Sequence, residues 1–304
     1  MAVSKAGRKR ARTAIRNHGA VRNHGAREKV AAQRSRARRA EARRRALLAG
    51  GSITLVIAVA VTIIVVKLTR TTASAAPSVA DTAVEQQVTA IPAATFDSVG
   101  AGTAAGLKTI SGQPELTLDG KPELLYMGGE YCPYCAAERW AIASAVSRFG
   151  LLSGLQFIHS SPADIYPDTP TLSFRQSGYA SKYLAFVPVE WYSETPDPAT
   201  PTGYAYLQQP TQQEAAAFSR YGGSFPFVDI GNRFLVPQAQ YVPSALAGLT
   251  WAQVASAMRD PHSPVARDID GAANMITAAI CTLTNGQPAG VCLSPGVTAA
   301  RSSI

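Results

Sequence analysis

Two cysteines stand three residues apart in the segment Cys132-Pro133-Tyr134-Cys135, between a strand-like run and a helix-like run. An apolar stretch at 124–127 precedes the segment, and residues 136–149 have helical character. A sulfur at a helix N-terminus faces free backbone N–H groups and the positive end of the helix dipole. Both favour the thiolate, so this position predicts a lowered pKa and a reactive Cys132.

A single C-x-x-C segment is compatible with half of a zinc site, a structural disulfide or a redox pair. Zinc needs at least three protein ligands, and the chain has no second C-x-x-C. We therefore expect no metal. A structural disulfide stays open, although a bond at a helix start is typical of a labile one. We favour a redox pair in which Cys132 attacks and Cys135 resolves, with Pro133 and Tyr134 tuning the Cys132 pKa and no other cofactor.

The first 45 residues carry the excess positive charge of the chain. They hold 16 Lys or Arg residues against Glu28 and Glu41, whereas the whole chain has a net charge of +9. Such a segment buries no core and is predicted to be disordered. We expect it to bind anionic lipid, because it lacks the aromatic residues and the folded motif that would favour nucleic acid.

Residues 46–66 contain no charge and, at ~1.5 Å per residue, are long enough to cross a ~30 Å bilayer core. The positive charge before them favours a cytoplasmic N-terminus and an extracytoplasmic C-terminal domain. A signal peptide cleaved near 73–75 fits less well, because the basic region is too long. We predict a single-pass protein of the cell membrane. All four cysteines then lie on the outer side, where disulfides persist.

Residues 67–111 are rich in small residues and are predicted to form an extracytoplasmic linker. Beyond them, strand-like and helix-like patterns alternate. Strands are expected at 122–127, 155–160, 171–175, 183–191, 227–230 and 233–236, and helices at 133–149, 211–221, 250–258 and from 263 onward. Capping-box patterns open the helices at 211 and 250, and Gly231-Asn232 predicts a tight hairpin.

This order of elements resembles an α/β domain of the thioredoxin superfamily. The resemblance implies a thioredoxin-like domain over 112–295, with an insertion at 161–210, an additional C-terminal helix and a flexible C-terminus at 296–304. In that superfamily a cis-proline precedes a strand beside the C-x-x-C segment, and the neighbouring backbone binds substrate. The segment 224–227 matches this position. The resemblance therefore implies Pro226 as the cis-proline and Phe225 as a substrate-binding residue.

Two departures from cytosolic thioredoxins bear on the direction of electron flow. Pro133 and Tyr134 replace the Gly-Pro pair between the cysteines, and Tyr126 replaces the buried acid six residues before the first cysteine. That acid assists target reduction, so an oxidase or isomerase is favoured over a reductase.

A closer resemblance rests on the segments 129–140, 147–150 and 226–232. They are similar to an uncharacterised membrane-anchored thioredoxin-like family, a domain of unknown function. Glu130 and Tyr131 adjoin the cysteines and are expected to tune the site. For the charges of Glu130, Glu138 and Arg139, a merely solvated ion pair is the ordinary expectation.

Cys281 and Cys292 bracket a turn-rich loop that follows the last long helix. A disulfide that closes this loop would stabilise the fold by about 3 kcal/mol. We predict a structural disulfide. A second redox pair is the alternative, but nothing in the loop supplies a helix start or a basic neighbour to activate a thiol.

Together these features predict a membrane-anchored thiol–disulfide oxidoreductase that forms or isomerises disulfides in exported proteins. Such an enzyme needs a membrane partner that generates disulfides or donates electrons. The alternative is a non-catalytic adaptor with a structural C-x-x-C disulfide, whose aromatic segment at 161–210 binds a partner.

Overall fold

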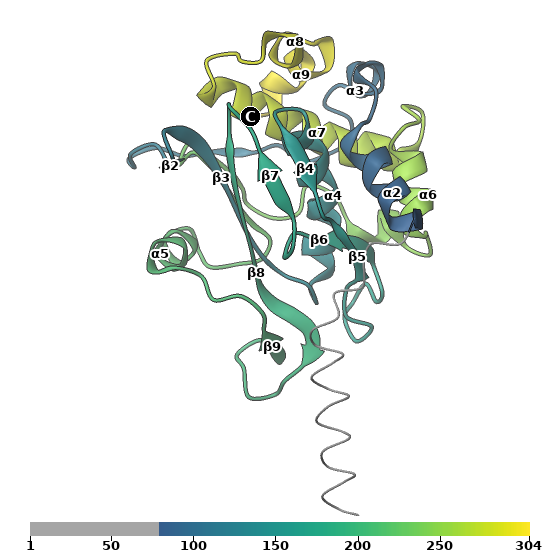
Figure 1. The fold of residues 1–304 in the computed structure, drawn as a ribbon, viewed down its shortest axis with the longest axis vertical. Coiled ribbons are helices and arrows are strands. Elements are labelled where there is room, and N and C mark those ends of the chain that lie inside the picture. Colours follow the sequence, from purple (N-terminus) through teal and green to yellow (C-terminus); the bar gives the residue numbers. More distant parts are fainter. Residues whose placement is uncertain (1–78) are drawn as a thin grey trace, which may run out of the picture. The chain divides into compact units, whose positions relative to one another are not determined.

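Strand β3 (Lys121–Gly129) lies within the main sheet of the computed structural model, which describes residues 79–304. It pairs in parallel with β8 (Ala185–Pro196) and antiparallel with β10 (Phe227–Ile230). The other strands of this sheet are β1 (Lys108–Thr109), β2 (Thr117–Leu118), β9 (Tyr204–Tyr206) and β11 (Phe234–Val236). The order is β1-β11-β10-β3-β8-β9, with β2 paired to β3 off this path (Figure 1). The chain is thus of the mixed α/β class, as predicted.

The two faces of this sheet bury separate apolar cores, because successive side chains of a strand point to opposite faces. The helices that cover the faces are α4 (Pro133–Ser147), α5 (Gln212–Arg220) and α7 (Pro264–Leu283). Leu124 and Tyr126 of β3 join the larger core with α4 and α7. Leu125 and Met127 join a smaller core with α5, which lies on the other side of the sheet (Figure 1).

Shorter elements surround these layers. Strand β4 (Leu151–Ser153) pairs with β7 (Gly178–Ala180), and β5 (Gln156–His159) pairs with β6 (Pro170–Ser173). The remaining helices are α2 (Val79–Thr89), α3 (Ala93–Val99), α6 (Trp251–Ala257), α8 (Ala289–Cys292) and α9 (Pro295–Ala300), with 3-10 turns at Pro243–Leu246 and Arg301–Ser303.

The local signals in the sequence are confirmed. Thr211 and Thr250 each form a complete capping box at the start of α5 and α6. Ser263 caps α7, with its hydroxyl accepting the backbone N–H of Val265. Asn232 adopts a positive φ of 54° in the turn between β10 and β11. These elements form where short-range hydrogen bonds and turn conformations dictate them.

The pairing of the second strand differs from our expectation. Residues 156–159 do form strand β5, but β5 pairs only with β6, outside the main sheet. The parallel partner of β3 is β8, which lies within the segment 161–210 that we predicted to be inserted. That segment is therefore part of the central sheet. Leu184 and Phe186 at the start of β8 are buried in the larger core, which explains its position.

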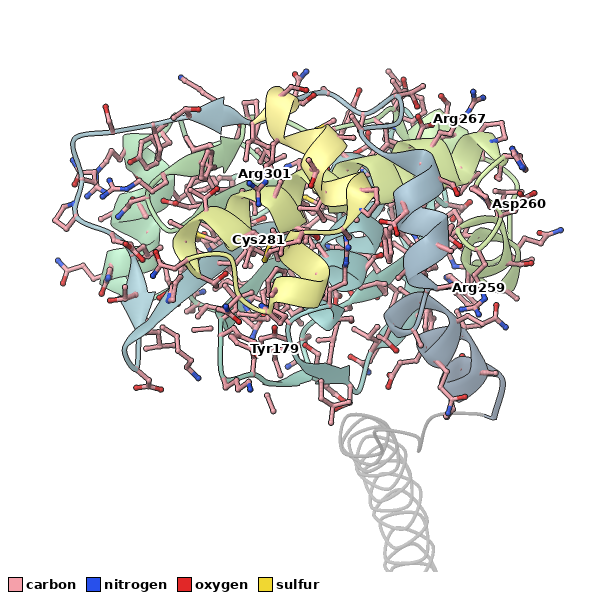
Figure 2. All side chains as sticks on the ribbon, turned by 90° about the horizontal axis from the view of Figure 1, so that it is seen from above. Tyr179, Arg259, Asp260, Arg267, Cys281 and Arg301 are labelled. Carbon is pink, nitrogen blue, oxygen red and sulfur yellow. A yellow bond between two sulfur atoms is a disulfide. The ribbon has the colours of Figure 1, made fainter. Side chains whose placement is uncertain are left out.

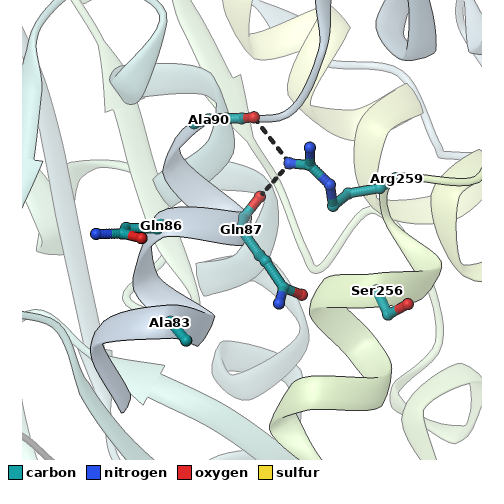
Figure 3. A pocket seen from close by; sticks show the side chains of 6 residues that line it. All are labelled: Ala83, Gln86, Gln87, Ala90, Ser256 and Arg259. Carbon is teal, nitrogen blue, oxygen red and sulfur yellow. Dashed lines mark hydrogen bonds between the residues drawn. The ribbon is translucent and has the colours of Figure 1, made fainter. Parts of the chain in front are cut away.

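The predicted linker and C-terminus are also corrected. Within 67–111, helices α2 and α3 place Val84, Val88 and Phe96 in the larger core. Arg259 fastens α2, donating hydrogen bonds to the carbonyl oxygens of Gln87 (3.3 Å) and Ala90 (2.8 Å), as Figure 3 shows. These apolar side chains recur at helical spacing, so the segment packs as helices rather than as a spacer.

The C-terminal residues 296–304, predicted to be flexible, are also structured. Val297 and Ala300 of α9 are buried. Arg301, labelled in Figure 2, donates a 3.0 Å hydrogen bond to the carbonyl oxygen of Cys292. The segment is thereby held against the end of the disulfide-bonded loop.

The predicted membrane segment 46–66 and the basic tail 1–45 lie outside the described residues. Among residues 79–304, no helix combines the length and apolar character needed to cross a membrane.

Candidate functional site

The cysteine pair lies where β3 gives way to α4. Cys132 is the N-cap of α4, and its sulfur accepts a 3.4 Å hydrogen bond from the backbone N–H of Cys135. Both cysteines are free thiols. Cys132 is 7% exposed, whereas Cys135 has no exposed surface. Of the two sulfurs, Cys132 is therefore the one nearer to solvent, as predicted.

The two thiols have opposite tendencies to ionise. A hydrogen bond from the Cys135 side chain is the main cause that lowers the pKa of Cys132. Backbone N–H groups and the charge of Arg139 lower it further, against the effect of burial. Burial, followed by the hydrogen bond to Cys132, raises the pKa of Cys135 well above its ordinary value. The negative charge therefore belongs on Cys132, in the direction that its place at a helix start predicts.

A fully buried ion pair lies beside the cysteines. Arg139, one turn beyond Cys135 on α4, donates to both carboxylate oxygens of Glu190 on β8, at 2.9 Å from Nε and 2.8 Å from Nη2. Neither side chain is exposed. Arg139 Nη2 also donates a 2.8 Å bond to the carbonyl oxygen of Gly129, the last residue of β3. The ion pair thus ties α4, β8 and the entry to the cysteine loop together.

The expectation of a solvated ion pair among Glu130, Glu138 and Arg139 was therefore wrong. Glu138 Oε2 instead accepts the backbone N–H of Gln240 at 2.9 Å, and burial raises the pKa of Glu138 to about 7. Glu130 accepts a hydrogen bond from a serine hydroxyl on β6, and burial raises its pKa to about 8. Sequence reasoning missed Glu190 because it lies 51 residues from Arg139.

The phenol of Tyr126 lies close to Cys135. Burial raises the pKa of Tyr126 well above its ordinary value, and its hydroxyl has no hydrogen-bond partner within residues 79–304. A Cβ on Gly128 would collide with that hydroxyl and would lie 3.1 Å from the Cys135 sulfur. Glycine at 128 therefore leaves room for both groups. The polar group beside Cys135 is thus a neutral phenol rather than a carboxylate that could accept a proton.

Aromatic rings connect the cysteine loop to the predicted substrate-binding residue Phe225. Tyr131 stacks on Tyr204 of β9, with ring centroids 4.1 Å apart. It also meets Tyr192 of β8 edge-on at 6.4 Å, and Tyr192 meets Phe225 at 6.0 Å. The structure therefore brings Tyr131 and Phe225 into one aromatic cluster. Sequence analysis did not identify Tyr204, which lies far from the cysteines along the chain.

Pro226 lies at the end of the sheet that carries the cysteine loop. The Phe225–Pro226 peptide bond is cis, as the resemblance implied. The next residue, Phe227, begins β10 and pairs with Met127 near the end of β3. The cysteine loop, which follows β3, and Pro226, which precedes β10, therefore lie at the same end of two neighbouring strands.

Tyr134 lies between the cysteines and is the exposed member of the loop. Its side chain is 39% exposed and meets the ring of Tyr166 edge-on at 5.7 Å. Pro133 occupies the first position of α4, where a missing N–H costs no helical hydrogen bond. The loop therefore combines a helix-compatible backbone with an aromatic ring at the surface.

The second cysteine pair forms the predicted disulfide. Cys281, labelled in Figure 2, lies in the last turn of α7. It is bonded to Cys292, with 5.5 Å between the Cα atoms. Within residues 79–304, no group of three or more His, Cys, Asp or Glu side chains is placed to hold a metal ion.

Fold and site together define a mixed α/β domain with a free, asymmetric cysteine pair at the start of a buried helix. Residues 109–282 match DUF929, a domain of unknown function, and the chain belongs to that family. No curated protein and no solved structure matches the chain.

Proposed function

We propose that this protein is a thioredoxin-like thiol–disulfide oxidoreductase. The order of its central elements supports the proposal: β3, α4 and the parallel β8 are followed by α5 and by the antiparallel strands β10 and β11. The cysteines lie at the start of α4, and Pro226 lies just before β10. These are the positions at which the superfamily places its redox pair and its cis-proline.

One observation carries the proposal, namely the difference between the two thiols. Cys132 is partly accessible, accepts a backbone N–H bond and has a lowered pKa, whereas Cys135 is fully buried with a raised pKa. Thiol–disulfide exchange needs one accessible thiolate that attacks or leaves, and one resolving thiol held back until a mixed disulfide exists. A disulfide with only a structural role needs no such asymmetry.

The exchange can be written for the oxidising direction. A substrate thiolate attacks the Cys132 sulfur of the Cys132–Cys135 disulfide, and Cys135 leaves and takes up a proton. A second substrate thiolate then attacks its own mixed-disulfide sulfur, and Cys132 leaves as the thiolate. The substrate loses two electrons and gains one disulfide, while the protein becomes the dithiol. A membrane partner that generates disulfides must then accept these two electrons.

The neighbours of Cys135 favour this direction over target reduction. In reduction, the Cys135 thiol must lose its proton in order to resolve the mixed disulfide. The Tyr126 hydroxyl lies beside Cys135 at Gly128, and its raised pKa keeps it protonated at neutral pH, so it is not available as a base for the Cys135 proton. We therefore place the protein with oxidases and isomerases.

The topology completes the proposal. We infer that residues 46–66 anchor the protein in the cell membrane, with the basic tail against anionic lipid on the cytoplasmic side. The described domain then faces exported proteins that contain cysteines. The disulfide between Cys281 and Cys292 is compatible with an oxidising compartment.

The first test is the reduction potential of the Cys132–Cys135 couple. The full-length protein is equilibrated in glutathione buffers, and the free thiols are counted by alkylation and mass. We expect a potential between about −120 and −180 mV, the range of oxidases and isomerases. A potential near about −270 mV would instead identify a reductase.

A Cys135→Ser variant separates the enzyme from the adaptor alternative. Without the resolving thiol, mixed disulfides between Cys132 and exported proteins should accumulate and disappear on treatment with a reductant. Cys132→Ser is the control and should capture none. If neither variant captures a protein and the wild type has no reversible dithiol couple, the adaptor with a structural disulfide replaces the enzyme.

A further inference from the structure

A cavity of about 210 Å³ lies on the α5 side of the sheet, away from the core that contains α4. Its walls combine apolar side chains with two carboxyl groups, and they include no Lys, Arg or His. The lining residues are Leu116, Thr117, Leu118, Glu123, Leu125, Val187, Thr211, Gln213, Glu214 and Ala217.

Glu123 is the unusual member of this lining. It is 7% exposed, and no hydrogen bond or ion pair joins its carboxyl group to another described residue, although its oxygens keep some access to solvent through the cavity. On β3 it lies two residues before Leu125 and so points to the same face of the sheet, under α5. A buried carboxyl without a partner is costly unless a ligand, a proton or water satisfies it.

The charges nearest to Glu123 repel a carboxylate. Glu214 approaches it from the first turn of α5, and Asp229 from the neighbouring strand β10. Burial is the largest cause that raises the pKa of Glu123 to about 7, and these two acids add to it. Arg220 of α5 acts on Asp229 and not on Glu123 among the causes of these shifts. Among the charged side chains that act on Glu123, there is thus no cation to offset the two acids.

The size and walls of the cavity restrict the ligand. At about 210 Å³, the cavity is smaller than the about 300–1,000 Å³ of sites that hold drug-sized ligands. Leu116, Leu125 and Val187 provide an apolar wall, against which methylene groups gain by leaving water. The ligand therefore needs a short apolar chain and one positively charged end.

We propose that this cavity binds an alkylammonium group, with its methylene chain against Leu116, Leu125 and Val187 and its charged nitrogen beside Glu123 and Glu214. A free aliphatic amine and a lysine side chain of a partner protein share this chemistry. The site is independent of the cysteine chemistry, because it lies on the opposite face of the sheet from α4.

Calorimetry on the full-length protein in detergent tests the proposal, with n-butylammonium chloride as the probe at pH 8. We expect saturable binding with one site per chain, and at least tenfold weaker binding of the neutral isostere n-butanol. Affinity should rise from pH 6 to pH 8 as Glu123 ionises. Equal affinity for the amine and the alcohol, or no binding of the amine, would overturn the proposal.

Three variants make the test specific. Glu123→Gln keeps the shape of the side chain and should weaken amine binding at least tenfold. Glu214→Gln preserves the capping box, which accepts either Glu or Gln. This variant should weaken amine binding less than Glu123→Gln does. Glu115→Gln removes an exposed carboxyl outside this cavity and should change nothing. Unchanged amine affinity in folded Glu123→Gln protein would contradict the proposed role of Glu123 in binding the amine.

The source of the amine is then assigned with two further ligands, 1,5-diaminopentane and a blocked Gly-Lys-Gly peptide. Binding of both, each weakened by Glu123→Gln, indicates a site that accepts the lysine side chain of a partner protein. Binding of the diamine alone indicates a small-molecule site that is too enclosed for a peptide.

Discussion

Cys132 and Cys281 are both buried cysteines at the end of a long helix, but they lie at opposite ends. Cys132 caps the N-terminus of α4, while Cys281 lies in the last turn of α7. Their exposed fractions, 7% and 2%, differ little. The helix dipole favours a thiolate at the first position and disfavours it at the second. The hydrogen bond from Cys135 and the position at a helix start therefore distinguish Cys132 from Cys281, and burial alone does not separate the free pair from the disulfide-bonded one.

The neighbours of each pair reinforce the difference. The charge of Arg139 acts on both Cys132 and Cys135, and Arg139 is held in place by Glu190. Near the disulfide, the guanidinium of Arg301 instead donates to the backbone carbonyl of Cys292. Arg139 thus lowers the pKa of Cys132, whereas Arg301 satisfies a backbone carbonyl at the end of α8.

The largest effect is expected from removing Cys132, in contrast to removing the disulfide-bonded pair. Cys132→Ser should abolish disulfide exchange with a model dithiol peptide, because no other thiol combines access with a lowered pKa. The Cys281→Ser/Cys292→Ser double variant should keep exchange within about threefold of the wild type. Circular dichroism confirms that each protein is folded. Exchange that persists in folded Cys132→Ser protein would show that we have chosen the wrong pair.

Removing Arg139 should be the next largest change. Arg139→Met leaves Glu190 buried without its partner, and losing one member of a buried ion pair costs about 3–5 kcal/mol of unfolding free energy. The pKa of Cys132 should also rise, which its thiolate absorbance measures. Arg139→Met combined with Glu190→Met should recover much of the stability without restoring the low pKa. A Cys132 pKa that stays unchanged in folded Arg139→Met protein contradicts the role given to this charge.

Loss of the disulfide should reduce stability without affecting the site. In the chain-entropy model, opening the loop between Cys281 and Cys292 lowers the free energy of unfolding by about 3 kcal/mol. Urea denaturation of the double serine variant measures this change. The Cys132–Cys135 reduction potential serves as the control and should not move. A shifted potential would indicate that the second pair exchanges electrons with the first.

Sequence reasoning succeeded for the features that short-range interactions decide. The position of Cys132 before α4, the caps at Thr211 and Thr250, and the turn at Asn232 each depend on groups within a few residues. The Cys281–Cys292 bond follows from the supply of cysteines and the intervening loop.

Long-range pairing was the part that the sequence did not reveal. Residues 155–160 and 183–191 have similar strand patterns, and only the packing of β8 against β3 distinguishes them. Arg139 is predicted to be solvated from its residue type alone, because its partner Glu190 is remote in sequence. Buried charge at the site can thus be recognised only after the central sheet has been assembled.

The smallest effect on the Cys132 thiolate separates two charged residues that adjoin on α4. Burial raises the pKa of Glu138 to about 7, yet Glu138 is not among the main causes that shift the pKa of Cys132. Because the folded state favours the protonated carboxyl, stability is full below the ordinary pKa of 4.5 and is lost as the pH rises through 7. At about 1.4 kcal/mol per pKa unit, the rise from 4.5 to about 7 corresponds to a loss of at most about 3.5 kcal/mol, most of it between pH 4.5 and pH 7.

Glu138→Gln should remove this part of the pH dependence, as measured by urea denaturation between pH 4 and pH 8, while Glu115→Gln at an exposed position should keep it. The Cys132 pKa should be the same in both variants, in contrast to Arg139→Met. A Cys132 pKa that moves in Glu138→Gln protein would mean that the thiolate responds to the whole buried layer of α4 and β8. It would then not be set by the helix end and Arg139 alone.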